Sequence, residues 1–227
     1  MKAPLVIGYR GEIGSFILRG LLRTMPKALN IWCHDINETE NERIDRITKA
    51  DVIFLCIPID QTIAWFKRNN RFLKGKTVIE QCSLKEIIRN IDHREFKLLS
   101  MHILFRPSAT PDRKDRNVLL VRHSDWDEEL VKHIEDITES KMCWIENIKE
   151  HDIAMAYEQA LIHKIILTLG GVIEGKTYIG KKIKELTDRI RNGDPKLYKM
   201  IQDNKYLQKA VNEFNKNFKN FDKITWE

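Results

Sequence analysis

The 227-residue sequence lacks the features of membrane proteins and of disulfide-stabilised secreted domains. No stretch approaches the roughly 18 uninterrupted apolar residues of a membrane-spanning helix, and we expect no signal peptide at the first residues. There are only four cysteines, Cys33, Cys56, Cys82 and Cys143, and no two of them form a CxxC pair. This spacing argues against a zinc site and against a disulfide framework. We therefore predict a cytoplasmic protein with free thiols, no bound metal and no membrane association.

A concentrated basic segment is also missing. The 39 Lys and Arg residues exceed the 33 Asp and Glu residues, for a formal net charge of +6, but they are spread along the chain. No basic block interleaved with aromatic residues marks a nucleic-acid-binding face, so we predict no nucleic-acid partner. A cleft that attracts a small anionic substrate accounts for the positive surplus. The 42% hydrophobic content is that of a globular chain, long enough for one core and an appendage.

Strand-like and helix-like patterns alternate up to about residue 146. The expected strands are Leu5–Gly8, Asn30–His34, Val52–Ile57, Thr77–Gln81, Lys97–His102, Val118–Val121 and Met142–Ile145. The expected helices between them are Ile13–Met25, Glu38–Lys49, Gln61–Asn69, Leu84–Ile91 and Trp126–Ser140. Such alternation predicts an α/β fold, a Rossmann-like doubly wound parallel sheet, with ligands at the carboxyl ends of the strands.

The strand pattern stops after Glu146, and only helices are expected beyond it: His151–Leu169, Ile183–Ile190 and Pro195–Phe218. We predict a dinucleotide-binding domain over residues 1–146 and a smaller all-helical domain for substrate binding and dimerisation over residues 147–227. The last predicted helix carries an apolar stripe that a short tail cannot bury alone, which favours a C2 homodimer. The stripe comprises Leu197, Met200, Ile201, Leu207, Val211, Phe214 and Phe218.

A glycine-containing turn joins the first expected strand to the first helix. The standard G-x-G-x-x-G spacing would place a glycine at position 9, where this chain has Tyr9 and a glycine one residue earlier. Glycines at such a turn let a pyrophosphate approach the backbone N–H groups and the helix N-terminus. A plain tight turn is the alternative. The predicted cofactor-binding residues here are Gly8, Tyr9, Arg10, Gly11, Glu12, Ile13 and Gly14.

Asp35 ends the second expected strand, in the segment IWCHD. A carboxylate at this position can accept hydrogen bonds from the adenosine ribose and would repel a 2′-phosphate, which favours NAD over NADP. Arg10 argues against this preference, because an arginine in the turn could bind the 2′-phosphate of NADP.

Two residues with catalytic chemistry fall near the carboxyl ends of expected strands. Ser83 follows TVIEQC, and His102 closes KLLSMH. A histidine beside a nicotinamide can accept a hydroxyl proton as hydride leaves the same carbon, because its pKa lies near neutral pH. A structural histidine is the alternative.

Five segments resemble, in the same order, motifs of the prephenate dehydrogenases of tyrosine biosynthesis. DVIFLCIPIDQT resembles the family's strand and cofactor loop, which contains Pro58 here, and EQCSLK resembles D-x-x-S-x-K. MHILFRP resembles H-P-M-F-G-P, EHDIAMAYEQALIH resembles E-H-D-x-x-M-x-x-x-Q-A-L-x-H, and DRIRNGDPKLY resembles R-x-x-x-x-D-P-x-L-Y. The resemblance maps an active-site serine onto Ser83 and the catalytic histidine onto His102. It maps a second active-site histidine onto His163 and a carboxylate-binding arginine onto Arg189.

The chain departs from these motifs at Glu80, where aspartate is usual, at Ile103, where proline is usual, and at Arg106, where glycine is usual. The loop changes leave prephenate and its amino analogue arogenate both open as substrates. Independently, His151, Met155, Gln159 and His163 are spaced by four, which predicts a single helical stripe. We interpret the stripe as lining a cleft, with Gln159 and His163 binding substrate.

The resemblance implies NAD-dependent oxidative decarboxylation of prephenate to 4-hydroxyphenylpyruvate, with His102 accepting the hydroxyl proton. Another Rossmann-plus-helices reductase is an alternative, of the β-hydroxyacid dehydrogenase or imine reductase type. The former needs a catalytic lysine, and Lys164 lies off the stripe. A non-catalytic dinucleotide-sensing protein is a further alternative. The sequence leaves association with a separate chorismate mutase undecided.

Overall fold

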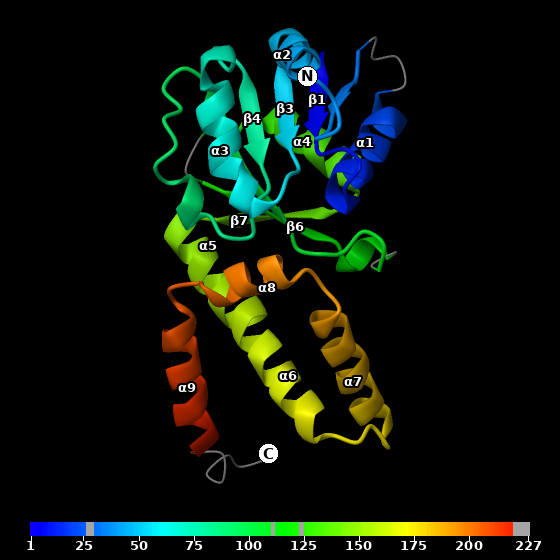
Figure 1. The fold of residues 1–227 in the computed structure, drawn as a ribbon, viewed down its shortest axis with the longest axis vertical. Helices are drawn as coiled ribbons and strands as arrows, with labels where there is room; N and C mark the ends of the chain where they lie inside the picture. Colours follow the sequence, from blue (N-terminus) through cyan, green and yellow to red (C-terminus); the bar gives the residue numbers. More distant parts are fainter. Residues whose placement is uncertain (26–29, 110–111, 123–124, 220–227) are drawn as a thin grey trace. The chain divides into compact units, whose positions relative to one another are not determined.

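The computed structural model describes residues 1–25, 30–109, 112–122 and 125–219. The chain divides into two compact units, Met1–Ile148 and Lys149–Glu227, which we call the Rossmann unit and the helical unit. The first contains a sheet with helices packed on it, and the described part of the second is helical (Figure 1). The predicted fold class is thereby confirmed.

The Rossmann unit is built on a seven-stranded sheet in the order β2-β1-β3-β4-β5-β6-β7. Every strand pair is parallel except β5 with β6, which is antiparallel, so the prediction of a parallel sheet holds with one reversed pairing. The strands are β1 (Pro4–Ile7), β2 (Trp32–His34), β3 (Val52–Leu55), β4 (Thr77–Glu80), β5 (Lys97–Ile103), β6 (Asn117–Val121) and β7 (Lys141–Ile145).

Helices cover both faces of this sheet, and each face has its own apolar core. Side chains such as Val6 and Phe54 pack with α1 (Glu12–Thr24) and α4 (Glu128–Thr138) on one face. Their strand neighbours pack with α2 (Glu40–Lys49) and α3 (Ile59–Asn69) on the other. Because both faces are buried, the central strands are apolar without alternation.

The predicted helix over Leu84–Ile91 is wrong. The structure has only a 3₁₀ turn, Glu86–Ile88, between β4 and β5. Lys85 within this segment is fully buried and hydrogen-bonded to Glu80 and to the backbone of Met101. These contacts anchor the segment to the sheet, so the chain turns tightly there.

The helical unit contains α6 (Ile162–Val172), α7 (Tyr178–Arg191), α8 (Pro195–Gln202) and α9 (Leu207–Lys219). The predicted helix from His151 is present, but it is divided into α5 (Ile148–Met155), a π-helical turn over Ala156–Leu161, and α6. None of the described helices is long and apolar enough to cross a membrane.

The prediction of one helix over Pro195–Phe218 is wrong, because the chain breaks between α8 and α9. Asn204 is buried in the break, where its side chain donates to the carbonyl of Asp152 at 2.7 Å and accepts from the N–H of Tyr206 at 3.0 Å. Side-chain bonds of this kind compete with helical backbone bonds. The predicted tail stripe therefore does not form one face, and Ile201 and Leu207 pack instead into a small core within the helical unit.

Candidate functional site

The glycine turn after β1 is shaped by backbone crowding. Gly8 has φ +79°, and a Cβ there would lie 2.3 Å from the carbonyl oxygen of Cys56. A Cβ on Gly14 would lie 2.1 Å from the carbonyl oxygen of Gly8. The protein itself therefore requires glycine at positions 8 and 14, which explains why the first glycine precedes Tyr9.

Gly11 differs from these two glycines. It is the N-cap of α1, and a Cβ there would meet only the carbonyl oxygen of Gly8, at 3.3 Å. The first N–H groups of a helix have no partner within the helix. A small residue at the N-cap thus leaves these donors accessible, which suits an anionic group such as a pyrophosphate.

Asp35, directly after β2, has an oriented carboxylate. Its Oδ2 accepts from the N–H of Arg10 at 3.0 Å, and its Oδ1 accepts from the N–H of Ile36 at 2.8 Å. Its own N–H donates to Oε2 of Glu38 at 2.9 Å, and the same oxygen accepts from Arg46 at 2.6 Å. Glu38 thus forms an ion pair with Arg46, and its carboxylate lies next to Asp35 after the end of β2.

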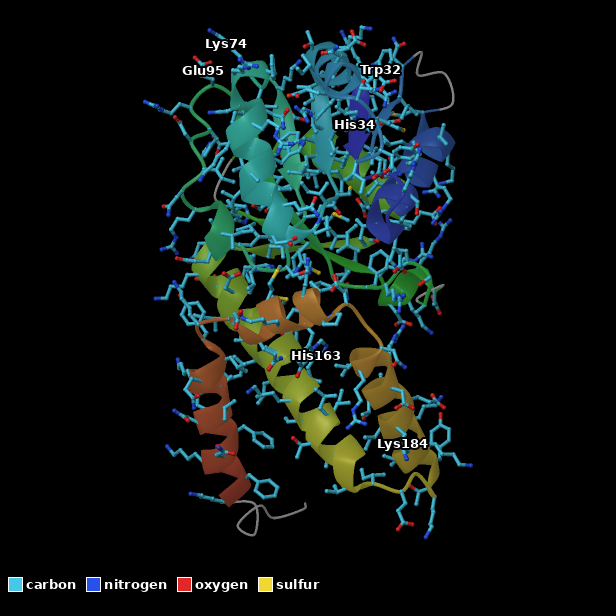
Figure 2. All side chains as sticks on the ribbon, in the orientation of Figure 1. Trp32, His34, Lys74, Glu95, His163 and Lys184 are labelled. Atoms are coloured by element: carbon cyan, nitrogen blue, oxygen red, sulfur yellow. The ribbon has the colours of Figure 1, made fainter. Side chains whose placement is uncertain are left out.

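His34, labelled in Figure 2, is the last residue of β2 and precedes Asp35. Its carbonyl accepts from the N–H of Gly8 at 2.8 Å, which links β2 to the glycine turn. Burial lowers the pKa of its imidazole, although Glu38 lies 3.1 Å from Nδ1. A neutral His34 therefore adds no positive charge beside Glu38, whose carboxylate is paired with Arg46 instead.

The carboxylate of Glu12, in the first turn of α1, contacts the loop that follows β5. It forms an ion pair with Arg106 at 3.0 Å and accepts from the N–H of Ser108 at 3.0 Å. Desolvation opposes ionisation, but hydrogen bonds from Ser108 and Arg106 outweigh it and lower the pKa of Glu12. Arg106, a departure from the family motif, thus compensates a carboxylate next to the glycine turn.

The carboxyl ends of β3, β4 and β5 carry the remaining predicted residues of the Rossmann unit. Pro58 is the N-cap of α3 in the short connection after β3, and Ser83 lies in the loop after β4. His102 is the penultimate residue of β5 and is 6% exposed. Its neighbours Met101 and Ile103 point into the α1–α4 core, so the imidazole faces the other side of the sheet.

His163, on α6 of the helical unit (Figure 2), stacks on an aromatic ring. Its imidazole lies parallel to the ring of Tyr198 on α8, with centroids 6.0 Å apart and planes 18° apart. Its Nδ1 is buried without a hydrogen-bond partner among the described residues, and burial lowers the pKa of the ring. This nitrogen therefore has an unused hydrogen-bonding capacity, and the lowered pKa favours the neutral imidazole.

The predicted stripe of residues spaced by four is not a single cleft-lining face. His151 is fully buried, with Nδ1 2.8 Å from the carboxylate of Asp152, and Met155 is buried as well. Gln159 lies in the π-helical turn. A π turn shifts the hydrogen bonding to i→i+5, so residues spaced by four no longer stack through it.

Arg189 is exposed on α7. Thr187, two residues earlier, faces α6, because its Oγ1 donates to the carbonyl of Ile166 at 3.2 Å. Two residues turn a helix by about 200°, so the Arg189 side chain points away from α6. The structure of this unit therefore does not bring Arg189 onto the His163 ring.

Comparison with known proteins rests on structure alone, because no family model and no curated protein matches the chain. A prephenate dehydrogenase from A. aeolicus, in complex with hydroxyphenyl propionate and NAD+, superposes with a TM-score of 0.71 at 17% identity, covering 98% of this chain and 90% of that one. An arogenate dehydrogenase from Synechocystis gives 0.64 at 17% identity, covering 96% and 89%. The chain has the fold of the prephenate and arogenate dehydrogenases.

The same fold extends to other reductases at lower similarity. A pyrroline carboxylate reductase from Plasmodium falciparum, with NADP bound, gives a TM-score of 0.54 at 16% identity, covering 96% of this chain and 91% of that one. The prephenate dehydrogenase structure is thus closer to this chain than the reductase is, in agreement with the resemblance seen in the sequence motifs.

Three residues of this prephenate dehydrogenase fold were missed by sequence reasoning. Glu38 holds the backbone of Asp35, Lys85 is buried behind the Ser83 loop, and Tyr198 stacks on His163. Lys85 and Tyr198 lie within the motifs EQCSLK and DPKLY, so a signal was present for them. For Glu38 the sequence offered only a position near Asp35.

Proposed function

We propose that this protein is an NAD-dependent dehydrogenase that converts prephenate oxidatively to 4-hydroxyphenylpyruvate and carbon dioxide. The observation that carries the proposal is the position of His102 and Ser83 at the carboxyl ends of adjacent strands, in a unit that begins with the glycine turn. The fold likeness to prephenate dehydrogenases supports it.

The residues present fit a nicotinamide dinucleotide. The open N-cap at Gly11 and the first N–H groups of α1 would hold the pyrophosphate, and Asp35 would accept hydrogen bonds from the ribose hydroxyls. Pro58 would line the nicotinamide side. The bound cofactor supplies the hydride acceptor. The carboxylate of Asp35 would repel a 2′-phosphate, so we propose NAD as the cofactor in preference to NADP.

The side chains of His102 and Ser83 would carry out the proton transfer. A neutral His102 imidazole would take the ring hydroxyl proton while hydride leaves the hydroxyl-bearing carbon. Ser83 would hydrogen-bond the hydroxyl or the imidazole. Loss of the ring carboxylate as carbon dioxide then makes the ring aromatic. Because His102 is almost fully buried, bulk water has little access to the proton being transferred.

The helical unit would hold the substrate. The buried Nδ1 of His163 would form a hydrogen bond with the substrate, and the side-chain amide of Gln159 would form another. Arg189, which lies apart from the His163 ring, would bind a carboxylate in a bidentate pair, as the resemblance to the family motif implies. Because the lowered pKa keeps His163 neutral, it would contribute a hydrogen bond and leave the charge pairing to Arg189.

We also propose that the protein is a homodimer through the helical unit. None of the residues of the apolar helix α6 is buried in this chain. Val172 on this helix and Ile179 on α7 are 76% and 69% exposed. A second copy would cover this apolar surface.

The deciding experiment mixes the protein with NAD and either prephenate or arogenate and follows NADH absorbance. We expect turnover of prephenate, and we expect His102→Asn to bind NADH normally while losing kcat by roughly a hundredfold or more. Ser83→Ala should lose less, because the base stays in place. Faster turnover of arogenate would reassign the substrate. NADH binding without turnover of either substrate would point to a sensing protein.

A further inference from the structure

A buried ion pair lies behind the two candidate catalytic residues. Nζ of Lys85 donates to Oε1 of Glu80 at 2.7 Å, and both side chains are 0% exposed. The ammonium also donates to the carbonyl of Met101 at 2.8 Å, and Oε2 of Glu80 accepts from the N–H of Cys82 at 2.7 Å. Three hydrogen bonds thus join the end of β4, the loop after it, and β5.

Stability alone is a weak reason for such a pair. Lysine and glutamate are almost never fully buried unless they are paired. Moving two charges out of water is costly, and apolar residues of similar volume often give equal or greater stability in place of a buried pair. The two backbone groups to which the pair is hydrogen-bonded therefore suggest a role other than stability.

The outer hydrogen bonds end on the backbone of the residues that precede the candidate catalytic residues. Cys82, whose N–H is bound, is the residue before Ser83, and the carbonyl of Met101 belongs to the peptide bond that leads into His102. The loop between β4 and β5 has no α-helix to hold it, only the 3₁₀ turn Glu86–Ile88. The ion pair thus takes the place of a crossover helix in fixing this loop against β5.

We propose that Glu80 and Lys85 are positioning residues that hold Ser83 and His102 in register with each other. The inference deepens the proposed function and rests on it. Neither side chain is available to touch substrate, because both are fully buried. Lysine suits the role because one ammonium can donate to a carboxylate and a carbonyl at once.

The test compares the double variant Glu80→Gln/Lys85→Met with Lys76→Met in the full-length protein. The double change removes both charges together, which avoids leaving one buried charge unpaired. Lys76 is a matched control, because its ammonium also binds two backbone carbonyls, those of Thr48 and Ala50, at 2.9 and 2.7 Å. Those contacts lie at the opposite, amino end of the strands.

We expect the double variant to fold and to bind NADH within about twofold of wild type. Its kcat with prephenate should fall roughly ten- to hundredfold, as for a small misplacement of reacting groups. Amide hydrogen exchange over residues 81–86 should rise about tenfold or more. Lys76→Met should lower the melting temperature and leave kcat within about twofold of wild type.

The proposal is overturned if the double variant keeps wild-type kcat and wild-type exchange over residues 81–86. It is also overturned if Lys76→Met loses as much kcat, since the loss would then follow general stability. If the wild-type protein does not turn over prephenate, the proposed function fails. The exchange comparison still decides in that case whether the pair holds the loop.

Discussion

Replacing Gly14 with alanine tests whether the glycine turn is shaped by backbone crowding. The added Cβ would lie 2.1 Å from the carbonyl oxygen of Gly8 and 2.8 Å from Cα of Tyr9. Neither neighbour is the end of a flexible side chain, so the backbone of the turn must move by about 1 Å or more to restore an ordinary contact. That movement displaces the N–H groups that we expect to face the pyrophosphate.

The size of the effect follows from two opposing contributions. Overpacking of this kind costs about 1–3 kcal/mol, and the better helix propensity of alanine returns up to about 1 kcal/mol. A net loss of about 1–2 kcal/mol corresponds to a melting temperature lower by roughly 2–8 °C for a chain of this length. Losing one hydrogen bond to a charged group, about 1.5–3 kcal/mol, weakens NADH binding roughly ten- to hundredfold.

The assay is NADH titration by fluorescence, together with thermal unfolding. Gly20→Ala is the matched control, because it lies on the same helix and its Cβ would lie 2.2 Å from the carbonyl oxygen of Ile137. We expect the control to lose a similar amount of stability and to bind NADH normally. Normal NADH affinity in Gly14→Ala would refute the reasoning about the turn.

Four further predictions follow from the same structure. Asp35→Ser should narrow the preference for NADH over NADPH in titrations, and a wild-type preference for NADPH would overturn the cofactor assignment. Arg189→Ala should chiefly raise KM for prephenate, as expected for uniform binding; a weaker NAD affinity with an unchanged KM would contradict its placement. Because burial lowers the pKa of His163 below its usual value of about 6.5, the folded state favours the neutral ring. Stability should thus be full above about pH 6.5 and fall as the pH drops toward the lowered pKa. Urea unfolding at pH 7.5 and 5 should show a smaller loss in His163→Gln; the decrease should be partial, because His34 contributes in the same direction. An equal loss in this variant would count against the assignment. Light scattering at micromolar concentration should give twice the chain mass of 26.8 kDa, and a monomer would refute the dimer.

Much of the fold could be read from the sequence, because its determinants are local. Strands buried on both faces must be continuously apolar, so β1 and β3 could be located before the order of the strands was known. A glycine-rich turn between the first strand and helix indicated the dinucleotide-binding architecture. The residues at the carboxyl ends of β4 and β5, including Ser83 and His102, could be named because parallel strands place those ends on one edge.

Other features depend on contacts between residues far apart in the chain, which periodicity does not record. Leu84–Ile91 has the pattern of a helix, but the buried Lys85 is held by Glu80 and by the carbonyl of Met101, and the segment forms a tight turn. The break after α8 depends on a hydrogen bond from Asn204 to a residue 52 positions earlier. The sequence by itself thus determined most of the element types and named the candidate site residues. Only the tertiary structure decided how those residues are held, because a polar side chain gains a buried partner only after the chain has folded around it.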